Sequence, residues 1–380
     1  MLERRSYLLA LTRSVRNNPV TAILGPRQCG KTTLARAFAA GRRATFFDLE
    51  NPRDRARLAA PMAALERLSG LIVLDEIQRM PELFGLLRVL VDQPSPRRRF
   101  VVLGSASPRL VRGASESLAG RVGFVDLGGF DLREVGQDRC WDLWLRGGLP
   151  RSFLAPSDPA SMEWREDFMR TFLERDIPQL GIGVPPETLR RFWTMVAHYH
   201  GQTWNASQFA RSLGASEPTA RRYLDILSGA YVVRQLPPWF ENLRKRQVKA
   251  PKVYLRDSGL LHALLGIANE SSLLSHAKAG ASWEGFAIEQ ILATFPTRDA
   301  YCWATHGGAE IDLLLVLGGR RYGIECKLAD APTMTRSLAI AMQDLRLDRA
   351  FVIYPGEHRY LLTDKAEAVP LRGIGALRLG

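Results

Sequence analysis

A glycine-rich segment near the N-terminus has the residue types and the spacing of a phosphate-binding loop. Residues 25–32 read GPRQCGKT and match the pattern G-x-x-x-x-G-K-[ST] at every fixed position. In such a loop, backbone N–H groups and the positive end of the following helix face the phosphates of a nucleotide. Lys31 would reach the β- and γ-phosphates, and the Thr32 hydroxyl would hold Mg²⁺. The predicted ATP-binding residues are Gly25, Pro26, Arg27, Gln28, Cys29, Gly30, Lys31, Thr32, Thr33 and Asp75.

Two carboxylates follow a second apolar run. Residues 70–76 read GLIVLDE, which is typical of a buried strand that ends in acidic residues. Asp75 would join Thr32 in the Mg²⁺ shell, and Glu76 would take a proton from the attacking water as general base. The alternative is that both acids lie in an exposed loop.

A serine follows a third apolar run. Residues 99–103 read RFVVL and predict another buried strand, after which Ser105 would face the γ-phosphate and sense hydrolysis. The same serine could instead cap a turn.

A second group of chemically suitable side chains lies near the C-terminus. Asp312 begins one strand of a predicted hairpin, Glu325 and Lys327 lie on its partner strand, and Glu284 lies on a helix predicted over 283–292. Residues 325 and 327 share one face of a strand, so they can meet Asp312 in one cleft. Glu284, Asp312 and Glu325 would bind Mg²⁺, and Lys327 would act on the attacking water. A buried charged network without metal is the alternative.

The sequence around the phosphate-binding loop and the two carboxylates predicts an α/β fold. The run VTAIL at 20–24 predicts a parallel strand before the glycine-rich loop, and a helix is predicted to begin at Lys31. Strands at 70–74 and 99–103 would complete the buried sheet.

The middle of the chain has the outline of a winged helix-turn-helix. Helices are predicted over 205–213 and 217–227 around a turn at 214–216, followed by a β-like segment at 231–236. Ser216 would cap the second helix, whose packed side would be Tyr223, Leu224 and Leu227. The residues expected to face a DNA groove or phosphates are Ser216, Thr219, Arg221 and Arg222. Such modules also bind proteins, so both partners stay open.

Charge favours an acidic partner. Lys and Arg outnumber Asp and Glu by 52 to 39, which gives a net charge of +13. The run at 244–246, with Lys249 and Lys252, would contact phosphates or form a solvated loop.

Other classes of protein are disfavoured. The sequence contains no apolar run long enough for a membrane helix and no secretory signal, which indicates a cytoplasmic protein. Cys29, Cys140, Cys302 and Cys326 have no CxxC spacing and are expected to be free thiols.

The motifs together resemble one known family. GPRQCGKTTL, LIVLDEIQRMPELF, VVLGSAS and SLAGR, followed by the segments at 147–150, 172–176, 254–257 and 283–285, resemble prokaryotic AAA-superfamily ATPases that carry a C-terminal domain of unknown function with a restriction-endonuclease-like fold. The resemblance implies an AAA-type P-loop ATPase domain over 1–145 and a helical lid with a winged helix over 146–267. A nuclease-like domain of the PD-(D/E)xK type would occupy 268–380.

Three residues acquire further interpretations from this resemblance. Arg121 would act as an arginine finger on a neighbouring subunit's nucleotide, which requires a homo-oligomer, or would pair on its own surface. Arg175 would contact nucleotide from the lid or form a salt bridge in its helix. Cys29 stands where the family usually has valine.

The predicted function is that of an ATP-hydrolysing, DNA-associated protein. Its nucleotide state would control the binding or remodelling of DNA, with branched DNA as one substrate suggested by analogy. Endonuclease activity in the C-terminal cleft stays open. The alternative is a nucleotide-controlled switch that binds a protein partner and carries an inactive nuclease-like adaptor domain. A small-molecule kinase is disfavoured, since the basic C-terminal modules have no place in one.

Overall fold

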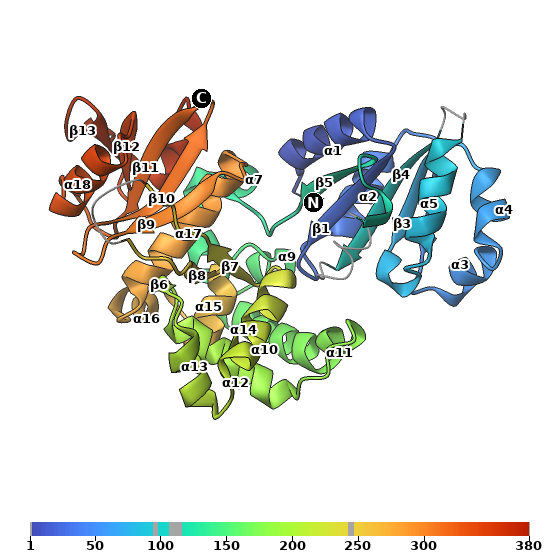
Figure 1. Cartoon of the computed structure of the whole chain (residues 1–380), viewed down its shortest axis with the longest axis horizontal. Helices are drawn as coiled ribbons and strands as arrows, with labels where there is room; N and C mark the ends of the chain where they lie inside the picture. Colours follow the sequence, from blue (N-terminus) through green and yellow to red (C-terminus); the bar gives the residue numbers. More distant parts are fainter. Residues whose placement is uncertain (1, 94–97, 106–115, 242–246, 380) are drawn as a thin grey trace. The chain divides into compact units, whose positions relative to one another are not determined.

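The computed structural model describes residues 2–93, 98–105, 116–241 and 247–379 (Figure 1). The chain divides into two compact units. The first comprises Met1–Gly129 with Gly229–Tyr231, and the second comprises Phe130–Ser228 with Val232–Gly380.

The first unit is built on a parallel sheet of five strands in the order β2-β3-β4-β1-β5. Its strands are β1 (Val20–Gly25), β2 (Ala44–Asp48), β3 (Gly70–Asp75), β4 (Arg98–Ser105) and β5 (Val122–Asp126). Its main helices are α1 (Arg5–Asn17), α2 (Lys31–Ala39), α3 (Pro52–Arg57), α4 (Pro61–Glu66) and α5 (Leu83–Asp92). Every residue of β1 is buried, which fits a parallel strand covered on both faces. The predicted parallel α/β domain is therefore confirmed.

The register of this sheet brings the ends of its strands together. Gly25 pairs with Ser105 across β1 and β4, and Asp48 pairs with Asp75 across β2 and β3. In a parallel sheet all carboxyl ends lie at one edge, where ligands usually bind. The predicted phosphate loop and the predicted acidic residues consequently lie at the same edge.

The second unit begins with short helices and a three-stranded antiparallel sheet. The helices are α7 (Leu132–Val135), α8 (Cys140–Arg146), α9 (Pro150–Phe153), α10 (Asp158–Thr171), the π-helical turn η3 (Phe172–Asp176), α11 (Ile177–Gln179), α12 (Pro186–His198), α13 (Ala206–Leu213) and α14 (Glu217–Gly229). The small sheet has the order β6-β8-β7, from β6 (Gln202–Thr203), β7 (Val233–Leu236) and β8 (Lys252–Leu255). The two predicted helices on either side of Gly214 are confirmed as α13 and α14.

The rest of the second unit contains a mixed sheet of six strands in the order β13-β14-β12-β11-β10-β9. Its strands are β9 (Ala300–Ala304), β10 (Glu310–Leu317), β11 (Arg320–Cys326), β12 (Arg349–Tyr354), β13 (Tyr360–Leu361) and β14 (Ala366–Pro370). The accompanying helices are α15 (Ser258–Leu264), α16 (Glu270–Ser275), α17 (Ala279–Thr294) and α18 (Arg336–Asp344). The predicted hairpin is confirmed, because β10 and β11 pair antiparallel around Gly318 and Gly319. Both glycines have positive φ, as a tight hairpin turn requires.

No helix in the described ranges is long and apolar enough to cross a membrane.

Candidate functional site

The phosphate loop has the backbone that its glycines permit. Gly25 ends β1 next to the segment that follows β5. A Cβ atom at Gly25 would lie 2.1 Å from the carbonyl oxygen of Leu127. Gly30 has a φ of 94° and precedes the first residue of α2, a conformation that side chains disfavour. The loop therefore leads directly into the N-terminus of a helix, the arrangement that binds phosphate.

Lys31 is buried at the start of α2 and points back over the loop. Its Nζ atom donates to the carbonyl oxygens of Gly25 at 3.0 Å and Pro26 at 2.8 Å. These bonds hold the ammonium above the loop backbone, where a nucleotide phosphate would provide a stronger, charged acceptor.

Thr32 and Asp75 meet as the sequence predicts. The Thr32 hydroxyl donates to Asp75 Oδ2 at 2.7 Å, and the other carboxylate oxygen accepts from the backbone N–H of Glu76 at 3.0 Å. Burial raises the pKa of Asp75, and the hydrogen bond from Thr32 opposes that rise. A hydroxyl and a carboxylate side by side are oxygen ligands of the kind Mg²⁺ binds in phosphoryl-transfer sites.

Glu76 follows Asp75 in an unusual backbone conformation. Its φ is 55°, in the left-handed region that a glutamate seldom occupies. Its Oε2 atom accepts a hydrogen bond from the side-chain amide of Gln78 in the short helix η1 (Ile77–Arg79). The turn therefore holds the carboxylate next to Asp75, and Gln78 is a contact that the sequence analysis missed.

A charged bridge beside the loop was also missed. Glu50 Oε1 lies 3.7 Å from an Arg27 guanidinium nitrogen and accepts from Arg79 at 3.0 Å. Arg27 belongs to the loop, Glu50 follows β2 and Arg79 lies in η1, so three segments of the site edge are linked. Because these three residues are far apart in the sequence, no local sequence pattern predicts that they meet.

Two further predicted residues differ in their placement. Ser105 ends β4 beside Gly25, at the edge that carries the loop, while its side chain lies outside the described part of the structure. Arg121 immediately precedes β5, at the amino-terminal ends of the strands and thus opposite the phosphate loop, since Val122 pairs with Val20. There Arg121 makes a two-pronged ion pair with Asp92 at 2.6 and 2.9 Å. Arg121 thus lies a whole strand length from the loop of its own chain.

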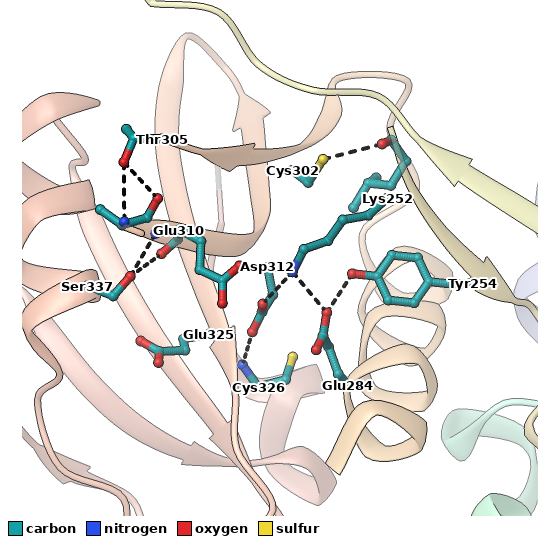
Figure 2. Close-up of polar contacts among 12 residues, drawn as sticks. Lys252, Tyr254, Glu284, Cys302, Thr305, Glu310, Asp312, Glu325, Cys326 and Ser337 are labelled. Carbon is teal, nitrogen blue, oxygen red and sulfur yellow. Dashed lines mark hydrogen bonds and ion pairs between the residues drawn. The ribbon is translucent and has the colours of Figure 1, made fainter. Parts of the chain in front are cut away.

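Two residues of the C-terminal group, Glu284 and Asp312, meet around Lys252, which the sequence had placed in a basic run. Lys252 Nζ lies 3.1 Å from Asp312 Oδ1, 3.3 Å from Glu284 Oε1 and 3.6 Å from Glu310 Oε2. Figure 2 shows the lysine side chain ending between the carboxylates of Asp312 and Glu284. Lys252 is only 6% exposed, so the prediction that it belongs to a phosphate-contacting or solvated basic run is wrong. Residues 244–246 of that run lie outside the described residues, and Lys249 is exposed.

Glu325 and Lys327 form a neighbouring pair. Lys327 Nζ lies 2.8 Å from Glu325 Oε1, and the Thr335 hydroxyl donates to both Glu325 oxygens at 3.0 and 3.3 Å. Across 2–93, 98–105, 116–241 and 247–379, no group of three or more His, Cys, Asp or Glu side chains is arranged to hold a metal ion.

Comparison with curated proteins identifies close relatives of the whole chain. An uncharacterized protein of Mycobacterium tuberculosis, Rv2008c, is 52% identical over 370 residues, which cover 97% of this chain and 84% of the relative. Mb2031c of Mycobacterium bovis matches to the same extent. The chain belongs to the family of these mycobacterial proteins.

Domain comparisons agree with the first unit's architecture. The family described as an AAA domain matches residues 17–136, and domains of unknown function, DUF8612 and DUF4143, match 137–271 and 279–374. The fold is also similar to that of a Walker-type ATPase of Pyrococcus abyssi, with a TM-score of 0.51 and 16% identity over 70% of this chain and 96% of that one. The N-terminal unit is therefore a parallel-sheet domain with a P-loop ATPase-like fold, and its residues 17–136 match an AAA domain.

On helix α14, the exposed and packed side chains are divided as the sequence predicts. Leu224 and Leu227 are buried and Tyr223 is half-buried, which confirms the packed side of α14. Arg221 and Arg222 are exposed and have no ion-pair partner within the described residues. Ser216 Oγ accepts from the backbone N–H of Thr219 at 3.3 Å, which confirms the predicted cap.

Two remaining predictions concern Arg175 and the cysteines. Arg175 is exposed on η3, and Cys29, Cys140, Cys302 and Cys326 are buried free thiols. The thiols were predicted correctly.

Proposed function

We propose that this protein binds ATP with Mg²⁺ at the phosphate loop and hydrolyses it. The hydrogen bond between Thr32 and Asp75 carries the proposal, because it joins the loop hydroxyl to the strand-end carboxylate. Lys31 would exchange its carbonyl acceptors for phosphate oxygens. Bound Mg²⁺ would supply positive charge to the phosphates, with Thr32 and Asp75 as the residues that hold it.

Glu76 is the proposed general base. Its carboxylate lies next to Asp75, and Gln78 donates to Oε2, which leaves Oε1 to accept a proton from water. The left-handed turn at Glu76 fixes the carboxylate at the sheet edge, where the γ-phosphate would lie.

Steady-state release of phosphate from ATP tests this proposal. Lys31→Ala should abolish nucleotide binding and turnover, whereas Glu76→Gln should bind ATP normally and turn over slower by about 10²-fold or more. Glu82→Gln is the matched control, since Glu82 is exposed at the start of α5. Unchanged turnover in Glu76→Gln would reject Glu76 as the base.

We further propose that the nucleotide state is coupled to DNA bound by the middle segment. In chain order, α12, β6, α13, α14, β7 and β8 follow the arrangement of a winged helix, and its antiparallel sheet has the matching order β6-β8-β7. The exposed pair Arg221 and Arg222 on α14, together with the net charge of +13, supports binding to a polyanion.

Fluorescence anisotropy with single-stranded, duplex and four-way-junction DNA tests this coupling. Arg221→Ala with Arg222→Ala should weaken binding and reduce its salt dependence by about two counterions. Arg298→Ala, another exposed arginine, is the control. ATP turnover measured with the same DNAs should rise with the form that binds best.

A protein-binding switch is the second candidate, and one observation favours it. Three residues between β7 and β8 contact β9 or the residue after it. Pro238 bridges to Cys302, Gln247 bridges to Thr305, and Val248 N–H donates to Ala304 O at 3.0 Å. The base of the proposed wing therefore already contacts protein. ATP turnover that is indifferent to every DNA form would favour this switch.

A further inference from the structure

Lys252 has a specific place in the acidic cluster formed by Glu284, Glu310 and Asp312. Its main chain lies in β8, where it pairs with Thr203 of β6 and Leu236 of β7. From this central strand the side chain reaches carboxylates on α17 and β10 (Figure 2). The cluster thus joins the small antiparallel sheet to the larger mixed sheet through one ammonium group.

The strand geometry directs Asp312 toward the lysine. The pairing of β10 with β9 shifts by one residue between Ile311 and Leu314, which is a β-bulge that contains Asp312. Bulges change the direction of side chains along a strand. Asp312 Oδ1 faces Lys252 while Oδ2 accepts from the backbone N–H of Cys326 at 2.9 Å.

The other carboxylates also have protein donors. Glu284 Oε1 accepts from the Tyr254 hydroxyl at 2.6 Å as well as facing Lys252. Glu325, the third predicted metal ligand, is occupied by Thr335 and Lys327. The oxygens that the sequence assigned to one Mg²⁺ ion are therefore divided between two separate groups of donors.

The Lys252 ammonium offsets part of the negative charge of the cluster, and solvent reaches the exposed Glu310 carboxylate. A buried ammonium needs anionic partners, because removing it from water is costly. A divalent cation among Glu284 and Asp312 would be repelled by Lys252 or would have to displace it, which would leave the lysine buried without its partners. The residues present therefore do not fit a metal site.

We propose that the Lys252 ammonium, and not a divalent metal, is the resident cation of the cluster formed by Glu284, Glu310 and Asp312. The cluster serves as a fixed joint between β8 and the C-terminal sheet. Metal-dependent cleavage of DNA at this cleft is consequently not expected.

Binding of Mn²⁺ to the full-length chain tests the proposal. Electron paramagnetic resonance of free Mn²⁺ would be recorded without nucleotide, in Asp75→Asn protein, so that the Thr32–Asp75 pair proposed to hold Mg²⁺ cannot contribute. We expect no saturable binding when Lys252 is present. Lys252→Met should create one Mn²⁺ site, because three carboxylates lose their internal counter-ion, and adding Asp312→Asn should remove it.

Thermal unfolding provides an independent measurement. Lys252→Met and Asp312→Asn should each lower the Tm, and the double variant should lose less than the sum of the two losses. Lys249→Met is the matched control and should leave both the Tm and Mn²⁺ binding unchanged, since Lys249 is exposed. If Lys252→Met does not fold, the protein that keeps Lys252 decides. A metal site predicts that Mn²⁺ raises its Tm and that Asp312→Asn removes this rise, whereas the ion pair predicts that Mn²⁺ leaves the Tm unchanged.

Three results would overturn the proposal. The first is saturable binding of Mn²⁺ by protein that keeps Lys252, if Asp312→Asn abolishes this binding. The second is a rise in the Tm of the protein that keeps Lys252 when Mn²⁺ is added. The third is Mg²⁺-dependent cleavage of DNA that is lost in Asp312→Asn.

Discussion

The Asp257 carboxylate accepts hydrogen bonds from the backbone N–H groups of Gly148 and Leu149, at 2.9 and 3.2 Å, and so joins segments 109 residues apart. The same side chain caps α15 by accepting from Leu260 N–H at 2.9 Å. Gly147 allows the close approach, since a Cβ atom there would lie 2.2 Å from Asp257 Oδ1. The sequence motifs at 147–150 and 254–257 therefore form one structural joint.

Asp257→Ala should destabilise the second unit by about 3 kcal/mol, because three partly buried N–H groups would lose their acceptor. Chemical denaturation monitored by circular dichroism would measure the loss. Asp257→Asn keeps one acceptor oxygen and should lose less. Equal losses in both variants would show that the hydrogen bonds contribute little.

Gly25→Ala should disrupt the phosphate loop, because the added methyl would collide with the Leu127 carbonyl. Loss of ATP binding and a lower Tm are expected, measured by nucleotide titration and thermal unfolding. Gly85→Ala is the control: a Cβ atom there meets nothing within 4 Å, and alanine in a helix should stabilise by roughly 0.5–1 kcal/mol.

Stability should fall in acid because two histidines are buried and uncharged. Burial lowers the pKa of His200 and of His262 to about 3, from an ordinary value of 6.5. The unfolded chain therefore binds more protons between about pH 6.5 and 3, and unfolding becomes easier as the pH falls through that window. The expected slope is at most about 1.4 kcal/mol per pH unit for each histidine.

His200→Asn should reduce this slope, since an asparagine oxygen can replace Nδ1 as the acceptor for Leu255 N–H. Denaturant titrations at several pH values would measure the slope. His306→Asn should not change it, because His306 is exposed. A slope that is unchanged in His200→Asn would assign the acid sensitivity to groups other than His200.

Arg121 should matter for turnover only through a second copy of the chain. It lies at the sheet edge opposite its own phosphate loop, where Asp92 holds it. If it is an arginine finger, Arg121→Ala should lower ATP turnover by about 10³-fold. Mixing it with inactive Lys31→Ala should restore part of the activity, as one copy would supply the arginine and the other the loop. Full activity of Arg121→Ala alone would leave it as a surface ion pair.

The nucleotide site could be read from sequence because its parts are local. Gly25, Gly30 and Lys31 belong to one short loop, and parallel-strand geometry brings Asp75 to the same edge. Lys252 could not be placed in this way, because its partners lie 32 to 60 residues later in the chain. Its neighbours at 244–246 suggested a solvated basic run. The apolar residues directly after it, VYL, were the signal that the lysine begins a buried strand.

Residues 237–239 and 247–248 contact β9 and the residue after it, and these contacts should limit uncontrolled assembly. An uncovered edge strand offers unpaired N–H and C=O groups to another chain. Pro238 and Gln247 occupy part of the outer side of β9, and the other edge strand, β13, contains only Tyr360 and Leu361. Neither edge of the mixed sheet therefore offers a long template for strand addition. Removal of the backbone contacts that Pro238 and Val248 make with β9 would expose such a template and should promote aggregation.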